Sequence, residues 1–295
     1  MEFTLRSGRY VVAVSGGVDS VALLHMLVQR PGMELTVAHF DHGIRPDSAE
    51  DRKLVEQQAK EFGLPFVYRE GELGAGTSEA AARKARYAFL HEVRQQSGAS
   101  AVITAHHQDD LLETVVLNLL RGTGRRGLSS LKSTDTIKRP LLHVPKKELL
   151  RFAEREGLLW REDSTNADEA YLRNYIRKNI LPRFADADRE VLLAISRRAR
   201  ELNAMIAEQT SNYLHMQPGA HTLDRHTFIM LPHTVAREVM AEWLLIHTDA
   251  EISRRMLERL VMAAKTGRSG SRVDVDASYW LDIGRTSLAL TLRER

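Results

Sequence analysis

The segment SGGVDS (residues 15–20) joins a run of β-branched apolar residues to a second apolar run with helical spacing. This pattern predicts a strand, a tight glycine turn and the start of a helix, whose first N–H groups attract an anion such as phosphate. The segment lacks the lysine of the common G-x-x-x-x-G-K-[ST] phosphate loop and the spaced glycines of a dinucleotide fingerprint. Asp19 stands in the turn instead. Taken alone, the segment could also be a glycine turn without a ligand.

A second polar cluster lies in TAHHQDDLLET (residues 104–114). Asp110 and Glu113 are three positions apart, which places both carboxylates on one face of a helix. Together with His106, His107 and Asp109 they could be ligands of zinc or manganese in a hydrolase. They could equally be a solvated surface, and the residues alone leave both interpretations open.

The first third of the chain contains the elements that would position these clusters. Four β-rich stretches, YVVAV, ELTVAHF, PFVYRE and ASAVITAHH, alternate with helical patterns over about 18–35, 47–62 and 78–97. This alternation predicts repeated βαβ units and a mainly parallel sheet. Ligands of such sheets bind beyond the carboxyl ends of the strands. Ser15, HFDHG (residues 39–43) and AHHQDD (residues 105–110) all lie at strand ends, so we expect one site there.

The second half of the chain loses the β-alternation. The pattern predicts a long helix from 188 to about 216, two helices near 233–247 and 251–265, and a small β-meander over 266–292. We therefore expect an α/β domain over 1–187, a connector helix over 188–215 and a smaller α+β domain over 216–295. The apolar stripe at 191–206 could pack within the chain or against a second copy in a homodimer.

The composition is typical of a globular protein, with 295 residues, of which 43% are hydrophobic and 27% are charged. No apolar run is long enough for a membrane span, and no signal peptide is expected at the start. The absence of cysteine excludes disulfides and thiolate metal sites, and the simplest location is the cytoplasm. Basic residues cluster in RGTGRRG, KRPLLHVPKK and YLRNYIRKN, which suits a polyanion such as RNA as well as a solvated surface.

SGGVDS resembles the signature of the PP-loop ATP pyrophosphatase superfamily. The resemblance implies that the loop holds the β,γ-pyrophosphate of ATP and that the bond between the α- and β-phosphates is broken. It further implies a Mg²⁺ ion near Asp19, which offsets the negative charge of that carboxylate beside phosphate. The ATP-binding residues implied in this way are Ser15, Gly16, Gly17, Val18, Asp19, Ser20 and His39.

Five further segments occur in the order typical of the tRNA(Ile)-lysidine synthetase family. They are HFDHGIRPDSAED, TSEAAARKARYAFL, TAHHQDDLLETVVLNLLRGTGRRGL, RPLL and EDSTNADEAYLRNYIRKNILP. This resemblance covers about residues 10–185. It implies that ATP adenylates C2 of the wobble cytidine in the CAU anticodon of tRNA(Ile), and that the ε-amine of free lysine then displaces AMP to give lysidine.

The resemblance also implies roles for single residues. Catalysis is expected to depend on Asp19, Arg86, Asp110 and Glu113, and lysine is expected to bind at His107, Asp110 and Glu113. Paired carboxylates can hold the lysine side chain, and one of them could accept its proton. The candidates for contact with tRNA are Arg125, Arg126, Arg173 and Arg177, of which Arg173 and Arg177 could face phosphate instead.

Other interpretations remain at this point. A tRNA thiolase of the same superfamily is disfavoured because the chain has no cysteine. Small-molecule synthetases of the superfamily lack the combination of TAHHQDDLLET with EDSTN. A relative acting on another amine or another tRNA is not excluded by one sequence, and a non-catalytic RNA-binding module is the alternative from a different class. EDSTN could also be a helix cap, with Ser164, Thr165 or Asn166 as the capping residue.

Overall fold

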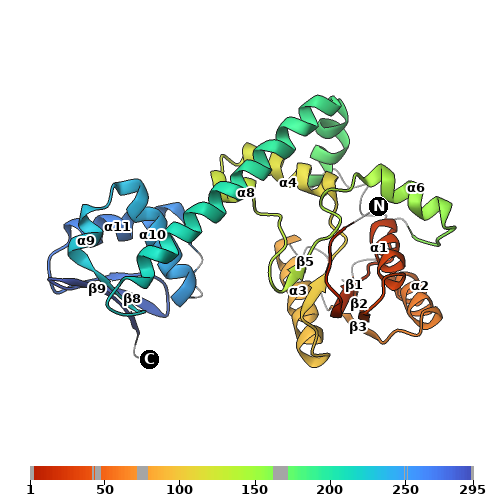
Figure 1. The fold of residues 1–295 in the computed structure, drawn as a ribbon, viewed down its shortest axis with the longest axis horizontal. Coiled ribbons are helices and arrows are strands. Elements are labelled where there is room, and N and C mark those ends of the chain that lie inside the picture. The colour runs from red at the N-terminus through yellow and green to blue at the C-terminus, as the bar shows by residue number, and fades with distance from the viewer. Residues whose placement is uncertain are drawn as a thin grey trace. The chain divides into compact units, whose positions relative to one another are not determined.

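The structure is a computed structural model that describes residues 3–41, 43, 48–71, 79–161, 172–248, 250 and 252–293. The chain divides into two compact units, Met1–Ala199 and Arg200–Arg295, whose elements are labelled in Figure 1. The EDSTN segment lies outside the described residues.

The first unit is built on a five-stranded sheet in which every neighbouring pair is parallel, in the order β3-β2-β1-β4-β5. The predicted α/β class is therefore confirmed. Four strands match the predicted stretches; the fifth has two residues, too few to give a recognisable pattern. The strands are β1 (Gly8–Ala13), β2 (Met33–Asp41), β3 (Phe66–Glu70), β4 (Ala101–Ile103) and β5 (Ile137–Lys138).

Helices cover both faces of this sheet. α1 (Val18–Val28), α2 (Ser48–Glu61) and α6 (Lys146–Arg155) share one apolar core with the sheet, to which Val12, Leu23 and Val55 contribute. α3 (Glu79–Gln96) packs on the opposite face through Phe89 and Leu90. The helices on both faces thereby hold the strands in position, including the strand ends at which a site is expected.

The first helix ends earlier than its apolar pattern predicts. The pattern extends to about residue 35, whereas α1 ends at Val28 and β2 begins at Met33. Pro31 cannot continue a helix, and Gly32 adopts a φ of +74°, which reverses the chain. The apolar residues after Gly32 therefore belong to the strand.

A small helical layer follows β4. α4 (Gln108–Leu120) packs through Leu112 and Val116 against Ile176 and Leu181. The latter two lie on a π-helix (Ile176–Ile180) and a 3₁₀ turn (Leu181–Arg183) that follow the short α7 (Leu172–Tyr175). This packing brings the basic segment around residue 175 onto α4. α5 (Arg125–Leu128) is a single turn beyond α4.

The second unit contains a four-stranded antiparallel sheet in the order β6-β9-β8-β7. The predicted meander corresponds to β7 (Ser271–Asp274), β8 (Tyr279–Ile283) and β9 (Ser287–Leu292), and β6 (Thr222–Asp224) adds an edge that the pattern did not indicate. The sheet shares a core with its helices through Trp243, Leu260 and Leu281. These helices are α9 (Arg225–Met230), α10 (His233–His247) and α11 (Arg254–Thr266).

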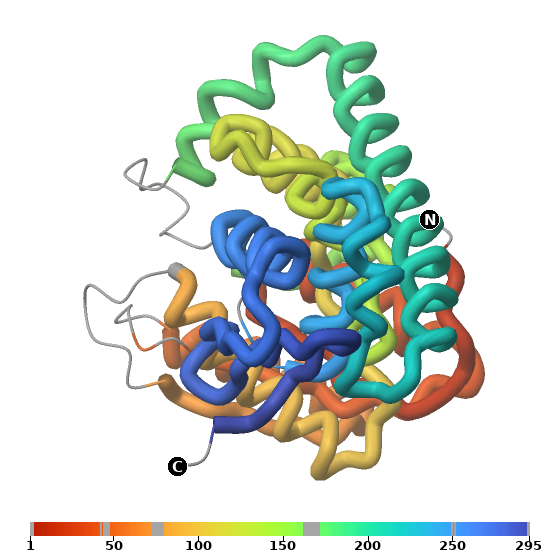
Figure 2. Tube along the Cα trace, turned by 90° about the vertical axis from the view of Figure 1, so that its left-hand side faces the viewer, coloured from red at the N-terminus to blue at the C-terminus, as the bar shows by residue number. Residues whose placement is uncertain are grey.

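α8 (Asp186–His215) is a helix of 30 residues that is unbroken from the end of the first unit into the second (Figure 2). The division between the two units falls inside it, after Ala199. Of the helices that the structure describes, none combines the length and apolarity needed to cross a membrane.

Candidate active site

Three polar segments meet where the strand order of the parallel sheet reverses. β1 lies between β2 and β4; Ser15 follows β1, His39 lies near the end of β2, and His106 follows β4. All three residues line one cavity of about 410 Å³. Such a reversal is the usual ligand site of an open α/β sheet, and the structure brings the expected clusters together there.

The loop of residues 15–20 is held closed by its own hydroxyl groups. Ser20 Oγ accepts a hydrogen bond from the Ser15 amide at 3.1 Å and donates one to the Gly17 carbonyl at 2.9 Å. Gly16 has a φ of +92°, a conformation that favours glycine. Gly17 is the N-cap of α1 and brings no side chain to cap the first N–H groups of the helix. The Val18 side chain is buried in the core, so only its backbone can serve a phosphate.

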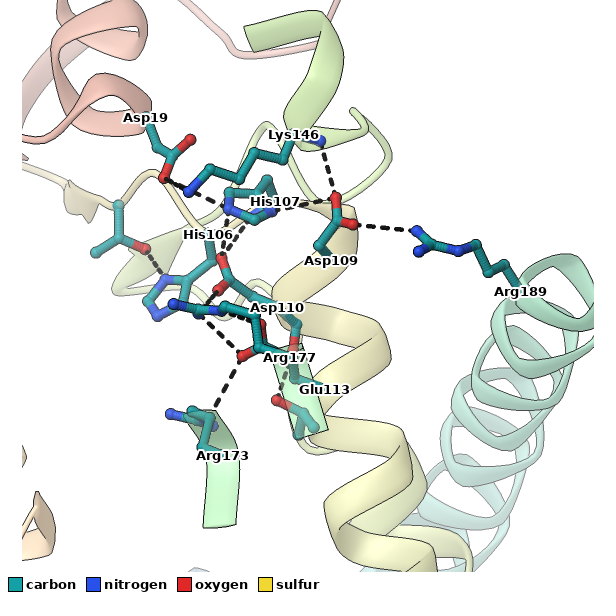
Figure 3. Close-up of polar contacts among 12 residues, drawn as sticks. Asp19, His106, His107, Asp109, Asp110, Glu113, Lys146, Arg173, Arg177 and Arg189 are labelled. Atoms are coloured by element: carbon teal, nitrogen blue, oxygen red, sulfur yellow. Dashed lines mark hydrogen bonds and ion pairs between the residues drawn. The ribbon is translucent and has the colours of Figure 1, made fainter. Parts of the chain in front are cut away.

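Asp19, at the start of α1, has two basic side chains beside one of its oxygens (Figure 3). Its Oδ2 is 3.5 Å from His107 Nε2 and 3.6 Å from Lys146 Nζ. Burial raises the pKa of Asp19, but His107 and Lys146 outweigh it and hold that pKa below its usual value. Asp19 is therefore a carboxylate at neutral pH.

Asp19 Oδ1 suits a divalent cation. This oxygen is buried and accepts no hydrogen bond from the described residues. Mg²⁺ in phosphate sites is usually held by one or two carboxylates together with phosphate oxygens and water, and Asp19 fits that mode. Within the same described residues, no three His, Cys, Asp or Glu side chains are grouped so as to hold a metal ion.

Two further cavity residues come from the flanking elements. His39 is 3% exposed, and its Nδ1–H donates to the Val14 carbonyl at 2.8 Å. Burial lowers the pKa of His39, so the ring is neutral. Arg86 comes from α3 and lines both this cavity and a second one of about 550 Å³.

α4 presents the carboxylate pair beside the loop. The His107 amide donates to Asp110 Oδ2 at 2.9 Å and so begins the helix. Glu113 is 1% exposed, and burial raises its pKa even though Arg177 opposes the shift. Asp110 and Glu113 both reach the Arg177 guanidinium, since Arg177 Nη2 is 3.5 Å from Asp110 Oδ1 and Arg177 Nε is 2.5 Å from Glu113 Oε1.

Arg173 and Arg177, expected to face tRNA, lie against this carboxylate pair. Arg177 Nη2 also donates to Glu113 Oε2 at 3.0 Å, which makes the contact bidentate, and Arg173 Nε is 3.9 Å from the same oxygen. Both arginines line the second cavity. Its other basic lining residues are Arg83, Arg86 and Arg121. This cavity is strongly basic, and Arg86, His106, Asp110 and Arg177 line it and the first cavity alike.

The two adjacent histidines have opposite electrostatic surroundings. His106 accepts or donates a hydrogen bond at Thr104 Oγ1, 2.8 Å away, and burial, followed by the charge of Arg139 and other arginines, lowers its pKa well below 6.5. Burial also lowers the pKa of His107, but Asp19, Asp110 and Asp109 outweigh it, and the result is a raised pKa. Of the two imidazole rings, that of His107 is therefore protonated more readily, and that of His106 is neutral.

In an NMR titration we expect His107 to have a pKa above the ordinary 6.5 and His106 to stay neutral down to acid pH. Asp19→Asn will lower the pKa of His107. Because the folded-state pKa exceeds the unfolded one, the stability that charged His107 contributes is complete below pH 6.5 and is lost as the pH rises through the folded pKa. His107→Gln removes this part of the pH dependence of the free energy of unfolding. A pKa for His107 below 6.5 would contradict the arrangement.

Other residues of the site were not identified from the sequence. Lys146 lies in the basic cluster KRPLLHVPKK, whose charge indicated either RNA contact or a solvated surface, and its amide donates to Asp109 Oδ2 at 2.8 Å. Arg189 of α8 donates to the other Asp109 oxygen at 3.2 Å. Arg125 and Arg126 lie on α5, outside the residues that line either cavity, and Arg126 is exposed.

Comparison with known proteins gives a consistent result. The family model of the PP-loop domain matches residues 3–184. A tRNA(Ile)-lysidine synthase of Solibacter usitatus is 35% identical over 297 residues, which cover 94% of this chain and 67% of that protein. One of Thermus thermophilus is 42% identical over 201 residues, covering 65% of this chain and 39% of that protein. The chain thus spans about two thirds of the first relative and less than half of the second.

Among solved structures, the U34-tRNA thiolase of Methanococcus maripaludis superposes with a TM-score of 0.55 at 17% identity, over 67% of this chain and 73% of that chain. At this identity the likeness concerns the fold alone, and it agrees with the parallel sheet of the first unit. The match of the PP-loop model and the identity to the Solibacter protein together establish the relationship: the chain belongs to the tRNA(Ile)-lysidine synthase family of PP-loop proteins.

Proposed function

We propose that the chain is a ligase that joins free lysine to C2 of the wobble cytidine in the CAU anticodon of tRNA(Ile), at the expense of ATP. The cytidine O2 attacks the α-phosphorus of ATP, and pyrophosphate leaves. The lysine ε-nitrogen then attacks C2, the C2–O2 bond breaks, and AMP leaves with that oxygen while the nitrogen gives up its proton.

One observation supports this proposal above the others: the cavity at the phosphate loop and the basic cavity at the carboxylate pair adjoin. Arg86, His106, Asp110 and Arg177 line both. A base that enters from the basic side can meet ATP on the other, with an amine held between them by Asp110 and Glu113. Holding the reactants together in this way accounts for much of the rate of a two-substrate reaction.

At the ATP end, Ser15, Gly16, Gly17, Ser20 and the backbone of Val18 hold the pyrophosphate, and Asp19 holds Mg²⁺. When bound, the ion would offset the negative charge of the phosphates. Arg86 faces the α-phosphate, where negative charge grows during the attack and a fixed cation is most effective. His39 is neutral, so it can lie beside the nucleotide without adding charge.

At the lysine end, the ammonium group takes the place that Arg177 now occupies on Glu113. A buried carboxylate needs a cation, and lysine supplies one as Arg177 leaves. The raised pKa of Glu113 also makes it a better proton acceptor than an ordinary carboxylate. Arg177 is then released toward the basic cavity, where it adds to the charge that faces the RNA.

The RNA strand occupies the basic cavity, and the anticodon arm extends over α5, where Arg126 is exposed. Arg126→Ala is expected to weaken tRNA binding and to reduce the slope of log K against log salt by about one. Binding isotherms at several salt concentrations measure both quantities. Arg155→Ala, which removes an exposed arginine of α6, is the matched control; equal slopes for the two variants would remove Arg126 from the RNA contact.

The proposed reaction would take place in the cytoplasm, where tRNA and free lysine are both present.

A homodimer is part of the same proposal. Val191 and Ile195 of α8 are 59% and 40% exposed, which leaves an apolar strip for a second copy. Light scattering on the purified protein tests it, and a monomer at micromolar concentration would remove this part.

The test of the function is pyrophosphate release from ATP with lysine and a CAU-anticodon tRNA(Ile) transcript, followed by omission of each in turn. Release that needs the tRNA, with radiolabelled lysine on the RNA, supports the proposal. Release without lysine incorporation would point to another amine. The absence of release under every condition would leave a nucleotide- and RNA-binding module.

A further inference from the structure

The segment that follows α6, residues 158–161, packs against the core and α2 next to the loop of residues 15–20. Leu158 is buried in the same core as α1, and Trp160 packs against that core. The Leu159 carbonyl accepts a hydrogen bond from Gln58 Nε2 of α2 at 2.9 Å. The segment thus has defined positions on two helices before it reaches Arg161.

Arg161 contacts the phosphate loop through its backbone. Its amide donates to the Gly16 carbonyl at 3.0 Å. Gly16 is the residue at which the loop turns, with its φ of +92°. The bond therefore fixes the orientation of the peptide unit that joins Gly16 to Gly17, the N-cap of α1.

The Arg161 side chain forms ion pairs with the first turn of α2. Arg161 Nε is 2.8 Å from Asp51 Oδ1, and Arg161 Nη1 is 2.5 Å from Glu50 Oε2. Asp51 is 5% exposed, whereas Glu50 is exposed. A buried carboxylate without a cation is strongly destabilising, so Asp51 constrains where Arg161 can lie.

Asp51 also lies directly behind the loop. A Cβ built on Gly16 would be 3.4 Å from Asp51 Cβ, which is ordinary van der Waals contact. Both Arg161 and Asp51 line the cavity at the loop. Loop, buried carboxylate and arginine are therefore three parts of one packed unit, although Asp51 and Arg161 alone are 110 residues apart in the chain.

We propose that Arg161 is a positioning residue for the phosphate loop: paired with Asp51, it holds the Gly16–Gly17 peptide in the orientation that ATP requires. Its action is indirect, through the loop backbone. Donors aimed at phosphate are effective because they need no reorientation when the ligand arrives, and the pair supplies that rigidity from outside the SGGVDS motif.

The proposal predicts an effect on ATP that is separate from any effect on lysine. Arg161→Met is expected to raise the KM for ATP about tenfold, as is typical of coupled contacts, and to leave the KM for lysine unchanged. Arg161→Lys is expected to raise the KM for ATP less than Arg161→Met does, because lysine keeps a positive charge beside the Asp51 carboxylate. Asp51→Asn will act like Arg161→Met, and the double variant will be no worse than either, because the two residues act as one pair.

The matched control is Arg9→Met, which removes an exposed arginine–glutamate pair with Glu34 on the same unit. It should change neither KM. Thermal unfolding of each variant is measured alongside. An unchanged KM for ATP in Arg161→Met, equal rises in both KM values, or additive effects in the double variant would each overturn the proposal.

The test does not depend on lysidine formation. Equilibrium binding of α,β-methylene ATP with Mg²⁺ reports on the loop even if no tRNA is modified. Tenfold weaker binding by Arg161→Met, with wild-type binding by Arg9→Met, supports the positioning role whatever the second substrate is. Equal binding by both variants rejects it while leaving the proposed function untouched.

Discussion

Replacing Asp19 by asparagine is expected to lower tRNA-dependent pyrophosphate release by about 10²- to 10³-fold while the protein stays folded. Asparagine keeps the shape of the side chain but removes its charge. Oδ2 then no longer neutralises His107 and Lys146, which lie 3.5 and 3.6 Å away, and Oδ1 loses its affinity for Mg²⁺. The measurement is the initial rate of pyrophosphate release at saturating lysine and tRNA.

Binding of ATP to the Asp19→Asn variant distinguishes the metal from the loop itself. Without Mg²⁺, removing a carboxylate beside the triphosphate relieves repulsion, so the variant should bind ATP at least as well as the wild type. With Mg²⁺, the order should reverse. Glu34→Gln, which removes one exposed negative charge from the same unit, is the control. Full activity of Asp19→Asn would remove the metal and phosphate role from this residue.

The sequence predicts the strand, glycine turn and helix around residues 15–20 and the edge of the sheet at which they lie, because both depend on local patterns; the phosphate role of the turn is implied by the family resemblance. A strand, a glycine turn and a helix follow one another within about twenty residues, and the carboxyl ends of parallel strands meet by geometry alone. The structure places Ser15, His39 and His106 around one cavity for this reason. Asp110 and Glu113 share a helix face for an equally local reason.

The ion pairs across the site could not be predicted from the sequence, because they join residues that are far apart in the chain and follow no periodic pattern. Arg177 is 64 positions from Glu113, and Arg161 is 110 from Asp51. The charge of the cluster around Arg177 indicated tRNA, phosphate or solvent as its partner, yet the packing of Ile176 on α4 turns Arg177 toward a buried carboxylate. A basic cluster in a sequence indicates that its partner is negatively charged. Which carboxylate or phosphate pairs with each arginine depends on the tertiary packing.

Replacing Glu113 by glutamine is expected to raise the KM for lysine about 10²-fold and to change the KM for ATP little. Glu113 is 1% exposed, so the loss of its charge cannot be made up by solvent. Glutamine retains the size of the side chain and can still accept a hydrogen bond, but it does not attract an ammonium group. Initial rates with lysine and ATP varied separately measure the two KM values. Glu92→Gln, which breaks an exposed pair with Arg69, is the control; a similar rise in both KM values would place Glu113 outside the lysine site.

A change on the other side of the same ion pair is expected to act in the opposite direction. If lysine replaces Arg177 on Glu113, then Arg177→Met removes the competing cation and lowers the KM for lysine, while kcat falls because the released guanidinium no longer faces the RNA. The buried Glu113 is then left without Arg177, at a cost of about 3–5 kcal/mol, and lysine should stabilise this variant against thermal unfolding more than it stabilises the wild type. A higher KM for lysine in both variants would mean that Arg177 and lysine bind side by side. Opposite signs for Glu113→Gln and Arg177→Met are the result expected if lysine and Arg177 compete for the carboxylate of Glu113.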